Sequence, residues 1–157
     1  MSSVIVLGAK GRFGRAAVNA FADAGWQVTR AGRELRGPGC LDVDATDTAA
    51  VVAACIDHQV IVNAVHPPYP EWSETVPKVT EAVIAAARAA DATVMIPGNI
   101  YNYGRDMPPV LREDTTWAAE TRKGIIRIRM ECAYRDSGVR TIVLRGGDFL
   151  DTEASGN

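Results

Sequence analysis

The stretch "VIVLGAKGRFGRAAV", residues 4–18, passes from an apolar run through a glycine-rich turn into a segment with helical spacing. Residues 3–7 form a short continuous apolar run, as expected of a strand buried on both faces of a sheet. Apolar residues then recur at helical spacing over residues 10–24, and Gly25 is a typical C-terminal stop. The first strand-to-helix turn therefore contains three glycines: Gly8, Gly11 and Gly14.

The same alternation of apolar runs and helical patterns continues along the chain. Residues 32–39 hold three glycines and a proline, so they predict a loop where a helix could have stood. Gly138 breaks the last helical pattern before the final apolar run. The further strands are expected over 26–32, 40–44, 59–65, 92–97 and 139–145, and the further helices over about 46–56, 73–90 and 116–136.

Two of these helices have apolar stripes that predict their buried faces. Thr46 or Asp47 can cap the shorter helix that precedes them. Residues 73–90 place Val76, Val79, Val83, Ala86 and Ala90 on one face. Residues 116–136 place Trp117, Ile125, Ile128 and Cys132 on another.

Strands that alternate with helices predict parallel pairing with right-handed crossovers. Six strands is the number found in a doubly wound dinucleotide-binding sheet, the Rossmann fold, with strand order 3-2-1-4-5-6. We therefore expect an α/β fold with one NAD(P)-binding domain over residues 1–150. Residues 151–157 are expected to be a polar tail.

Length and composition agree with a single globular domain. The chain has 157 residues, 47% hydrophobic and 23% charged, and a formal net charge of −2. That charge gives no electrostatic case for a nucleic-acid or membrane partner. No apolar run is long enough to span a membrane and no signal peptide opens the chain, so a cytoplasmic location is expected.

The sequence gives little reason to expect a metal site. The three cysteines are far apart and form no CxxC pair, so we expect buried thiols rather than a disulfide framework or zinc site. The acidic group Asp42, Asp44 and Asp47 lacks the glycine and distal glutamate of a calcium loop.

The glycine spacing has a physical explanation in dinucleotide binding. Gly8 permits a tight turn, Gly11 lets the backbone approach a pyrophosphate, and Gly14 lets the helix pack closely on the sheet. The phosphates would lie at the helix N-terminus, where N–H groups and the helix dipole favour an anion. The alternative is that the glycines serve helix–sheet packing alone. The other residues of this turn in the predicted cofactor site are Lys10, Arg12 and Phe13.

The end of the second strand bears on the choice of cofactor. A site that prefers NAD usually has an acidic residue there, which holds the ribose 2′-hydroxyl. Here Arg30 and Arg33 occupy that corner, and Glu34 comes later. Guanidinium groups suit a 2′-phosphate, so NADP is the expected cofactor, with NAD as second choice. The alternative is that both arginines are merely solvated.

Several motifs resemble the short-chain dehydrogenase/reductase superfamily, particularly its extended branch of NAD-dependent epimerases and dehydratases. The resemblance covers nearly the whole chain. It implies that Asp44 and Ala45 line the adenine pocket, although Asp44 could simply end a turn before a helix. It also implies that Asn63, Ala64 and Val65 pass beside the cofactor ribose, although Asn63 could instead satisfy backbone groups. The motifs are GAKGRFG at 8–14, DATD at 44–47, VNAV at 62–65, NIYNYG at 99–104 and RGGDF at 145–149.

The catalytic residues of that family are replaced here. Alignment puts Asn99 at the family's serine, Lys123 at its tyrosine and Arg127 at its lysine. Asn99 can still hydrogen-bond a substrate oxygen, Arg127 can hold a ribose, and Lys123 beside that cation could act as a base. The alternative is an exposed helix stripe in which Arg127 pairs with Glu131, four residues on.

Other acid/base candidates lie on loops after strands. Tyr101 and Tyr103 follow the fifth strand, while His66 and Tyr69 follow the fourth, and ligand sites in such folds form beyond these strand ends. Tyr101 joins the predicted catalytic set. His58 has no partner in the sequence and is expected to be solvated.

Three hypotheses of function follow. The first is an NADP-dependent oxidoreductase, or an epimerase/dehydratase, with an atypical catalytic site and an unknown small-molecule substrate. The second is a non-catalytic dinucleotide sensor or scaffold. The third is the cofactor half of a longer enzyme, since extended family members carry a C-terminal substrate domain that is absent or truncated here. The resemblance also implies a homodimer through helices 73–90 and 116–136, although the sheet alone accounts for their apolar stripes.

Overall fold

A computed structural model of the chain describes residues 1–147. The sheet has six parallel strands in the order β3-β2-β1-β4-β5-β6, which confirms the predicted order. The predicted tail 151–157 and the last three residues of the predicted domain lie outside the described residues. The strands are β1 (Ser3–Leu7), β2 (Gln27–Gly32), β3 (Cys40–Asp42), β4 (Val60–Asn63), β5 (Thr93–Gly98) and β6 (Thr141–Arg145).

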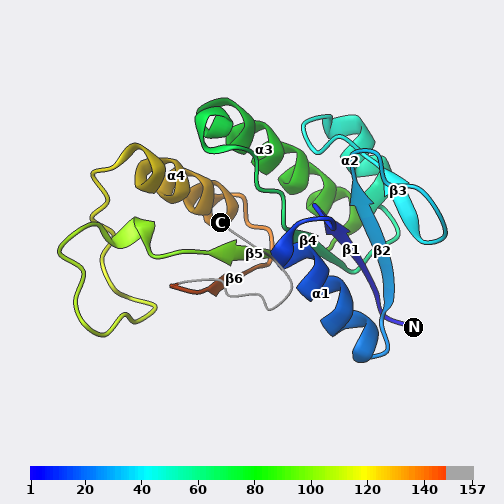
Figure 1. Cartoon of the computed structure of the whole chain (residues 1–157), viewed down its shortest axis with the longest axis horizontal. Helices are drawn as coiled ribbons and strands as arrows, with labels where there is room; N and C mark the ends of the chain where they lie inside the picture. Colours follow the sequence, from blue (N-terminus) through cyan, green and yellow to red (C-terminus); the bar gives the residue numbers. More distant parts are fainter. Residues whose placement is uncertain (148–157) are drawn as a thin grey trace.

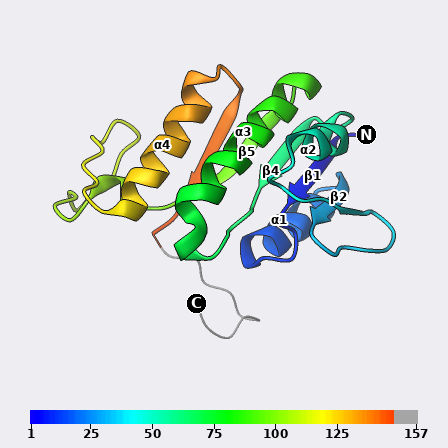
Figure 2. The same cartoon turned by 90° about the horizontal axis from the view of Figure 1, so that it is seen from above.

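Helices cover the sheet unequally on its two faces. In Figure 1, α1 (Arg12–Asp23) lies on one face, and the remaining α-helices lie on the other. Viewed from above in Figure 2, those three helices lie side by side across the sheet. They are α2 (Thr48–Cys55), α3 (Trp72–Ala90) and α4 (Arg122–Asp136), and two short 3-10 turns, η1 (Tyr69–Glu71) and η2 (Tyr101–Tyr103), precede α3 and follow β5.

The central strand β1 explains the division of the core. Ile5 and Leu7 point into the larger cluster under α2, α3 and α4, whereas Val4 and Val6 point into the smaller cluster under α1. All four side chains are buried, because β1 lies between β2 and β4 with a helix layer on each face. The predicted α3 stripe is confirmed, since all five of its residues lie in or against the larger cluster.

The predicted start of the last helix was wrong. The helix begins at Arg122, not near residue 116, and Thr121 caps it by accepting a hydrogen bond from the Gly124 N–H. Trp117 therefore lies outside the helix, and Ile125 is exposed. The residues of α4 that are buried are Gly124, Met130, Glu131 and Tyr134. The apolar spacing misplaced the start of the helix because the N-cap at Thr121, and not the apolar stripe, determines where the helix begins.

The arrangement creates one position suited to a ligand. From β1 the chain proceeds to β2 and β3 on one side, and from β4 it proceeds to β5 and β6 on the other. The carboxyl ends of β1 and β4 are thus the point at which the strand order reverses. In open α/β sheets, ligands bind in the crevice beyond such a point.

Candidate functional site

The glycine turn after β1 is built so closely that side chains are excluded. Gly8 has φ +77°, and a Cβ there would lie 2.7 Å from the carbonyl carbon of Ala64 on β4's extension. A Cβ on Gly14 would lie 2.2 Å from the Gly8 oxygen. Gly8 and Gly14 therefore let α1 and the β4 segment approach the turn. Gly11 is the N-cap of α1 and has no side chain with which to cap that helix terminus.

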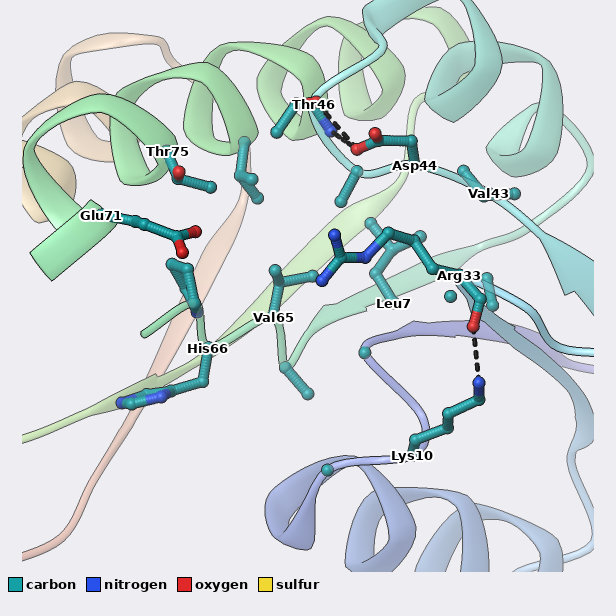
Figure 3. A pocket seen from close by; sticks show the side chains of 18 of the residues that line it. Leu7, Lys10, Arg33, Val43, Asp44, Thr46, Val65, His66, Glu71 and Thr75 are labelled. Carbon is teal, nitrogen blue, oxygen red and sulfur yellow. Dashed lines mark hydrogen bonds between the residues drawn. The ribbon is translucent and has the colours of Figure 1, made fainter. Parts of the chain in front are cut away.

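A cavity of about 620 Å³ opens beside this turn, within the usual range for small-molecule sites. Its walls come from the ends of β1 and β2, the segment after β3, the segment after β4 and the first turns of α3 (Figure 3). Eight of the predicted cofactor-binding residues line it: Gly8, Lys10, Gly11, Arg33, Asp44, Ala45, Ala64 and Val65. Further lining residues that the sequence analysis did not assign to cofactor binding include Thr46, Glu71, Thr75 and Val79.

Two cations mark the wall at the end of β2. Lys10 Nζ donates hydrogen bonds to the carbonyl oxygens of Arg33, at 2.6 Å, and of Glu34, at 3.2 Å. Lys10 thereby ties the glycine turn to the loop after β2. Figure 3 shows the Arg33 side chain extending into the cavity, away from the backbone that Lys10 holds. Arg33 thus lies on the cavity wall at the corner for which the sequence predicts the ribose 2′-position, and Lys10, predicted in the glycine turn, is bonded to the backbone there.

Asp44 is held in place by its own turn. Its Oδ1 accepts hydrogen bonds from the Thr46 N–H, at 2.9 Å, and the Thr46 hydroxyl, at 2.8 Å. These bonds are the main cause of the lowered pKa of Asp44, with Arg33 contributing further. Asp47, not Thr46, caps α2 by accepting a bond from the Ala50 N–H. Asp44 is therefore an ionised acceptor on the cavity wall at neutral pH.

The other five predicted cofactor residues lie outside the cavity lining. Arg30 donates to the Pro38 carbonyl at 3.0 Å and so braces the β2–β3 loop. Asn63 is buried, donating to the Tyr134 hydroxyl at 3.1 Å and accepting from the Val65 N–H at 3.2 Å. Asn63 therefore satisfies a backbone N–H group, as the alternative interpretation of this residue expected. Arg12, Phe13 and Gly14 form the first turn of α1.

Tyr134 is a residue that sequence reasoning missed. It lies on α4, its side chain is fully buried, and burial raises the pKa of its hydroxyl. It holds the Asn63 amide, which in turn orients the backbone of Val65 on the cavity wall. No sequence signal links residues 63 and 134, because only the crossover from β5 to β6 brings α4 over β4.

The α4 residues predicted to be catalytic point elsewhere. Lys123 Nζ lies 3.5 Å from the centre of the Tyr69 ring, a cation–π contact. Arg127 donates to the Pro97 carbonyl, and burial lowers the pKa of its guanidinium. Neither residue lines the cavity.

The alternative prediction, in which Arg127 pairs with Glu131 on an exposed helix face, was also wrong. Glu131 is buried, and its Oε2 accepts a hydrogen bond from Arg145 Nη2 on β6 at 2.6 Å. Arg145 Nη1 also donates to the Asn99 carbonyl at 2.6 Å. Glu131, which the spacing paired with Arg127, thus forms an ion pair with Arg145, and this pair fixes the loop after β5.

The remaining candidates for catalysis lie on the loops after β4 and β5. Asn99 accepts the Tyr101 N–H at 3.0 Å, and Tyr103 is buried beneath the Arg145 guanidinium. His66 lines the cavity, with its ring edge-on to the rings of Tyr69 and Trp72. Asn99, Tyr101 and Tyr103 do not line the cavity.

The expectation for His58 was wrong. Its Nε2 lies 2.8 Å from the Thr29 hydroxyl, and its Nδ1 is buried, so His58 is not solvated. Of the three cysteines expected to be buried, Cys55 is buried, whereas Cys40 and Cys132 are partly exposed. Burial raises the pKa of the Cys55 thiol to about 12.

Residues 1–147 contain no candidate metal centre and no candidate membrane span. No group of three or more histidine, cysteine or acidic side chains in this part of the chain is arranged to hold a metal ion. None of the helices in the same residues combines the length and apolar character needed to cross a membrane.

Comparison with known proteins identifies the fold. No family model matches the chain, and no curated protein matches it. Solved structures do. UDP-glucose 4-epimerase from Brucella ovis, in complex with NAD, superposes with a TM-score of 0.80 at 17% identity, over 94% of this chain and 54% of that one.

Two further structures give similar values. Bordetella bronchiseptica WbmH in complex with NAD+ has a TM-score of 0.79 at 18% identity, over 92% of this chain and 55% of that one. A short-chain dehydrogenase/reductase superfamily protein from Agrobacterium tumefaciens with bound NAD has a TM-score of 0.71 at 21% identity, over 91% and 48%. The chain therefore has the doubly wound fold of these epimerase and short-chain dehydrogenase/reductase structures, and it spans about half of their length.

Proposed function

We propose that this chain binds a nicotinamide dinucleotide, with NADP(H) preferred, as the cofactor-binding part of an extended short-chain dehydrogenase/reductase. The observation that carries the proposal is the cavity at the switch point, with Gly8 and Gly11 on one wall and Arg33 and Asp44 on another. A pyrophosphate fits at the N-terminus of α1, where Gly11 offers backbone and no side chain. The structures named above support the binding of a nicotinamide dinucleotide, since all three hold NAD, and they give no support to the preference for NADP(H).

The preference for NADP rests on the cations at the end of β2. Arg33 projects into the cavity, so its positive charge is available to a 2′-phosphate, while Lys10 Nζ donates to the carbonyls of Arg33 and Glu34 and holds the loop that carries Arg33. Two acidic residues lie near that corner: Glu34 lines the cavity, and Asp42 accepts the Glu34 N–H at 2.8 Å and so stabilises the loop. A 2′-phosphate gains more from a guanidinium than a ribose hydroxyl does.

The Gly11→Val variant tests the phosphate position. A Cβ at Gly11 would lie 3.3 Å from the Gly8 oxygen, which the turn can accommodate with a small shift. The branched side chain would instead occupy the space before the helix N-terminus. We expect isothermal titration to show NADPH affinity at least about a hundredfold lower, roughly 2.7 kcal/mol, with thermal unfolding still cooperative. Unchanged affinity in a folded variant would place the pyrophosphate elsewhere.

The Arg33→Ala variant tests the choice of cofactor. Loss of a charge-assisted hydrogen bond costs roughly 1.5–3 kcal/mol, so NADPH affinity should fall by about ten- to a hundredfold. NADH affinity should change little, because NADH has no 2′-phosphate. Arg30→Ala is the matched control, since Arg30 donates to the Pro38 carbonyl outside the cavity lining. Equal losses for NADPH and NADH would show that Arg33 does not read the phosphate.

One observation favours the alternative function, a dinucleotide sensor or scaffold without catalytic activity. Lys123 and Arg127, at the family's catalytic positions, are engaged with Tyr69 and the Pro97 carbonyl, as expected of a sensor or scaffold that binds without turnover. We propose the oxidoreductase or epimerase/dehydratase role because His66 supplies another titratable group on the cavity wall. Oxidation of NADPH across a panel of aldehydes, ketones and nucleotide sugars separates the two roles.

A further inference from the structure

His66 is held in a defined orientation at the edge of the cavity. It follows β4 directly after the segment Asn63–Val65 and lines the cavity. Its ring centre lies 5.4 Å from that of Tyr69 and 5.3 Å from that of Trp72, in edge-on geometry with both. Trp72 is itself buried, and its indole nitrogen donates to the Pro67 carbonyl at 3.0 Å. The imidazole is therefore positioned by contacts with two aromatic rings, although the residue itself is exposed.

The charges around His66 keep its ring neutral. Burial lowers the pKa of His66, and the positive charges of Arg127 and Lys123 on α4 lower it further. From η1, the Tyr69 ring packs against the imidazole, and the Glu71 carboxylate lines the same cavity. Because desolvation, followed by the charge of Arg127, lowers the His66 pKa, the imidazole is unprotonated at neutral pH, the state in which it can accept a proton.

The position of His66 assigns it to one half of the site. The cations that act on it lie on α4, which follows β5, whereas Arg33 and Asp44 follow β2 and β3. Figure 3 shows the imidazole directed away from Arg33, Asp44 and Lys10. With the adenosine on the β2–β3 side and the pyrophosphate at the glycine turn, the half beyond β4 is left for the nicotinamide.

We propose that His66 is the residue that exchanges a proton with the substrate at the nicotinamide half of this site. The proposal rests on the proposed dinucleotide binding. In the direction of oxidation, the substrate hydroxyl gives its proton to the unprotonated ring nitrogen of His66. The adjacent C–H bond breaks at the same time, and its hydride passes with both electrons to the oxidised nicotinamide. A carbonyl group and an imidazolium result, so atoms and charge balance.

This assignment accounts for the family's missing tyrosine. The resemblance placed Lys123 at that position on α4, but Lys123 lies over the Tyr69 ring and outside the cavity lining. His66 lines the edge of the cavity from the segment after β4 instead. Lys123 and Arg127 then act on His66 through their charges, as positioning residues that favour its neutral form.

Protection from diethylpyrocarbonate tests whether His66 faces the nicotinamide. The chain has two histidines, so carbethoxylation of untagged protein can be followed at each by peptide mass spectrometry. With NADP+ at ten times its Kd or more, about one molecule in ten is free, so modification of His66 should slow at least about tenfold. Adenosine 2′,5′-bisphosphate, which lacks the nicotinamide, should leave the rate at His66 unchanged. His58 is the internal control: it lies at the opposite end of β4, and it should react slowly with or without either nucleotide, because its Nε2 contacts the Thr29 hydroxyl and its Nδ1 is buried.

The outcomes distinguish this proposal from the proposed function. Absence of NADP+ binding in calorimetry would overturn both. Binding without protection of His66, or equal protection by the bisphosphate alone, would overturn the role of His66 and leave dinucleotide binding intact.

A charge difference between the two cofactor forms provides a second test. The oxidised nicotinamide carries a positive charge that the reduced ring lacks, and a nearby cation disfavours imidazolium. By NMR, the titration midpoint of His66 should therefore lie at lower pH with NADP+ than with NADPH, while that of His58 stays unchanged. Equal midpoints for His66 would show that its ring is not close to the nicotinamide. In any reaction that the substrate panel reveals, His66→Gln should lower kcat at least about a hundredfold while the Kd for NADPH is retained.

Discussion

The Gly14→Ala variant should lose about 3 kcal/mol of unfolding free energy or more, or fail to fold. Helix propensity alone predicts the opposite, a gain of about 1 kcal/mol, since alanine replaces glycine inside α1. The steric clash of the added Cβ outweighs this gain, so the unfolding free energy falls. A Cβ at residue 14 would lie 2.2 Å from the Gly8 oxygen and 2.9 Å from the Ala9 Cα. Both are backbone atoms of the turn, so neither can move aside by changing a rotamer.

Urea denaturation followed by circular dichroism measures this loss. Gly147→Ala is the control, because among residues 1–147, apart from its chain neighbours, no atom would lie within 4 Å of a Cβ at Gly147. It should leave the midpoint nearly unchanged. A Gly14→Ala protein as stable as the parent would mean that α1 does not pack on the turn as closely as the structure shows.

The Arg145→Met variant should have the second large effect. Glu131 is buried, with 3% of its side chain exposed, and Arg145 is its ion-pair partner at 2.6 Å. Removing one partner of a buried pair leaves a carboxylate without compensation, at a cost of about 3–5 kcal/mol. Arg145 also donates to the Asn99 carbonyl, so the loop after β5 should lose its anchor. Hydrogen exchange of residues 99–104 should increase together with the fall in the denaturation midpoint.

Two further variants separate the ion pair from mere loss of side-chain contacts. Arg135→Met removes an exposed pair with Asp136, and it should change stability little. The double variant Arg145→Met with Glu131→Leu removes both charges and should recover most of the lost stability. Failure of the double variant to recover stability would show that Arg145 acts chiefly through the Asn99 carbonyl.

The strand order could be predicted because local signals agreed along the chain. The buried run of β1, the glycine turn and the stripe of α3 each follow from a short stretch of sequence. The cavity wall formed by Gly8, Gly11 and Arg33 follows from that order, because the ends of adjacent parallel strands meet at one edge. The start of α4 was mispredicted because Thr121 offers a cap that the apolar spacing does not reveal.

The groups at the far end of the site could not be predicted in the same way. The spacing of Lys123, Arg127 and Glu131 describes one helix face, but their partners lie on three other segments: Tyr69, the Pro97 carbonyl and Arg145. The cations that lower the pKa of His66 lie on α4, far from it in the chain, although its ring contacts with Tyr69 and Trp72 are local.

The sequence by itself determined the alternation of strands and helices, the parallel sheet and the glycine turn, because periodicity and backbone sterics act over a few neighbouring residues. Only the tertiary structure decided which side chains enter the cavity. The partners of Arg127 and Glu131, and the cations that act on His66, belong to elements distant in the chain, and helix spacing contains no information about them.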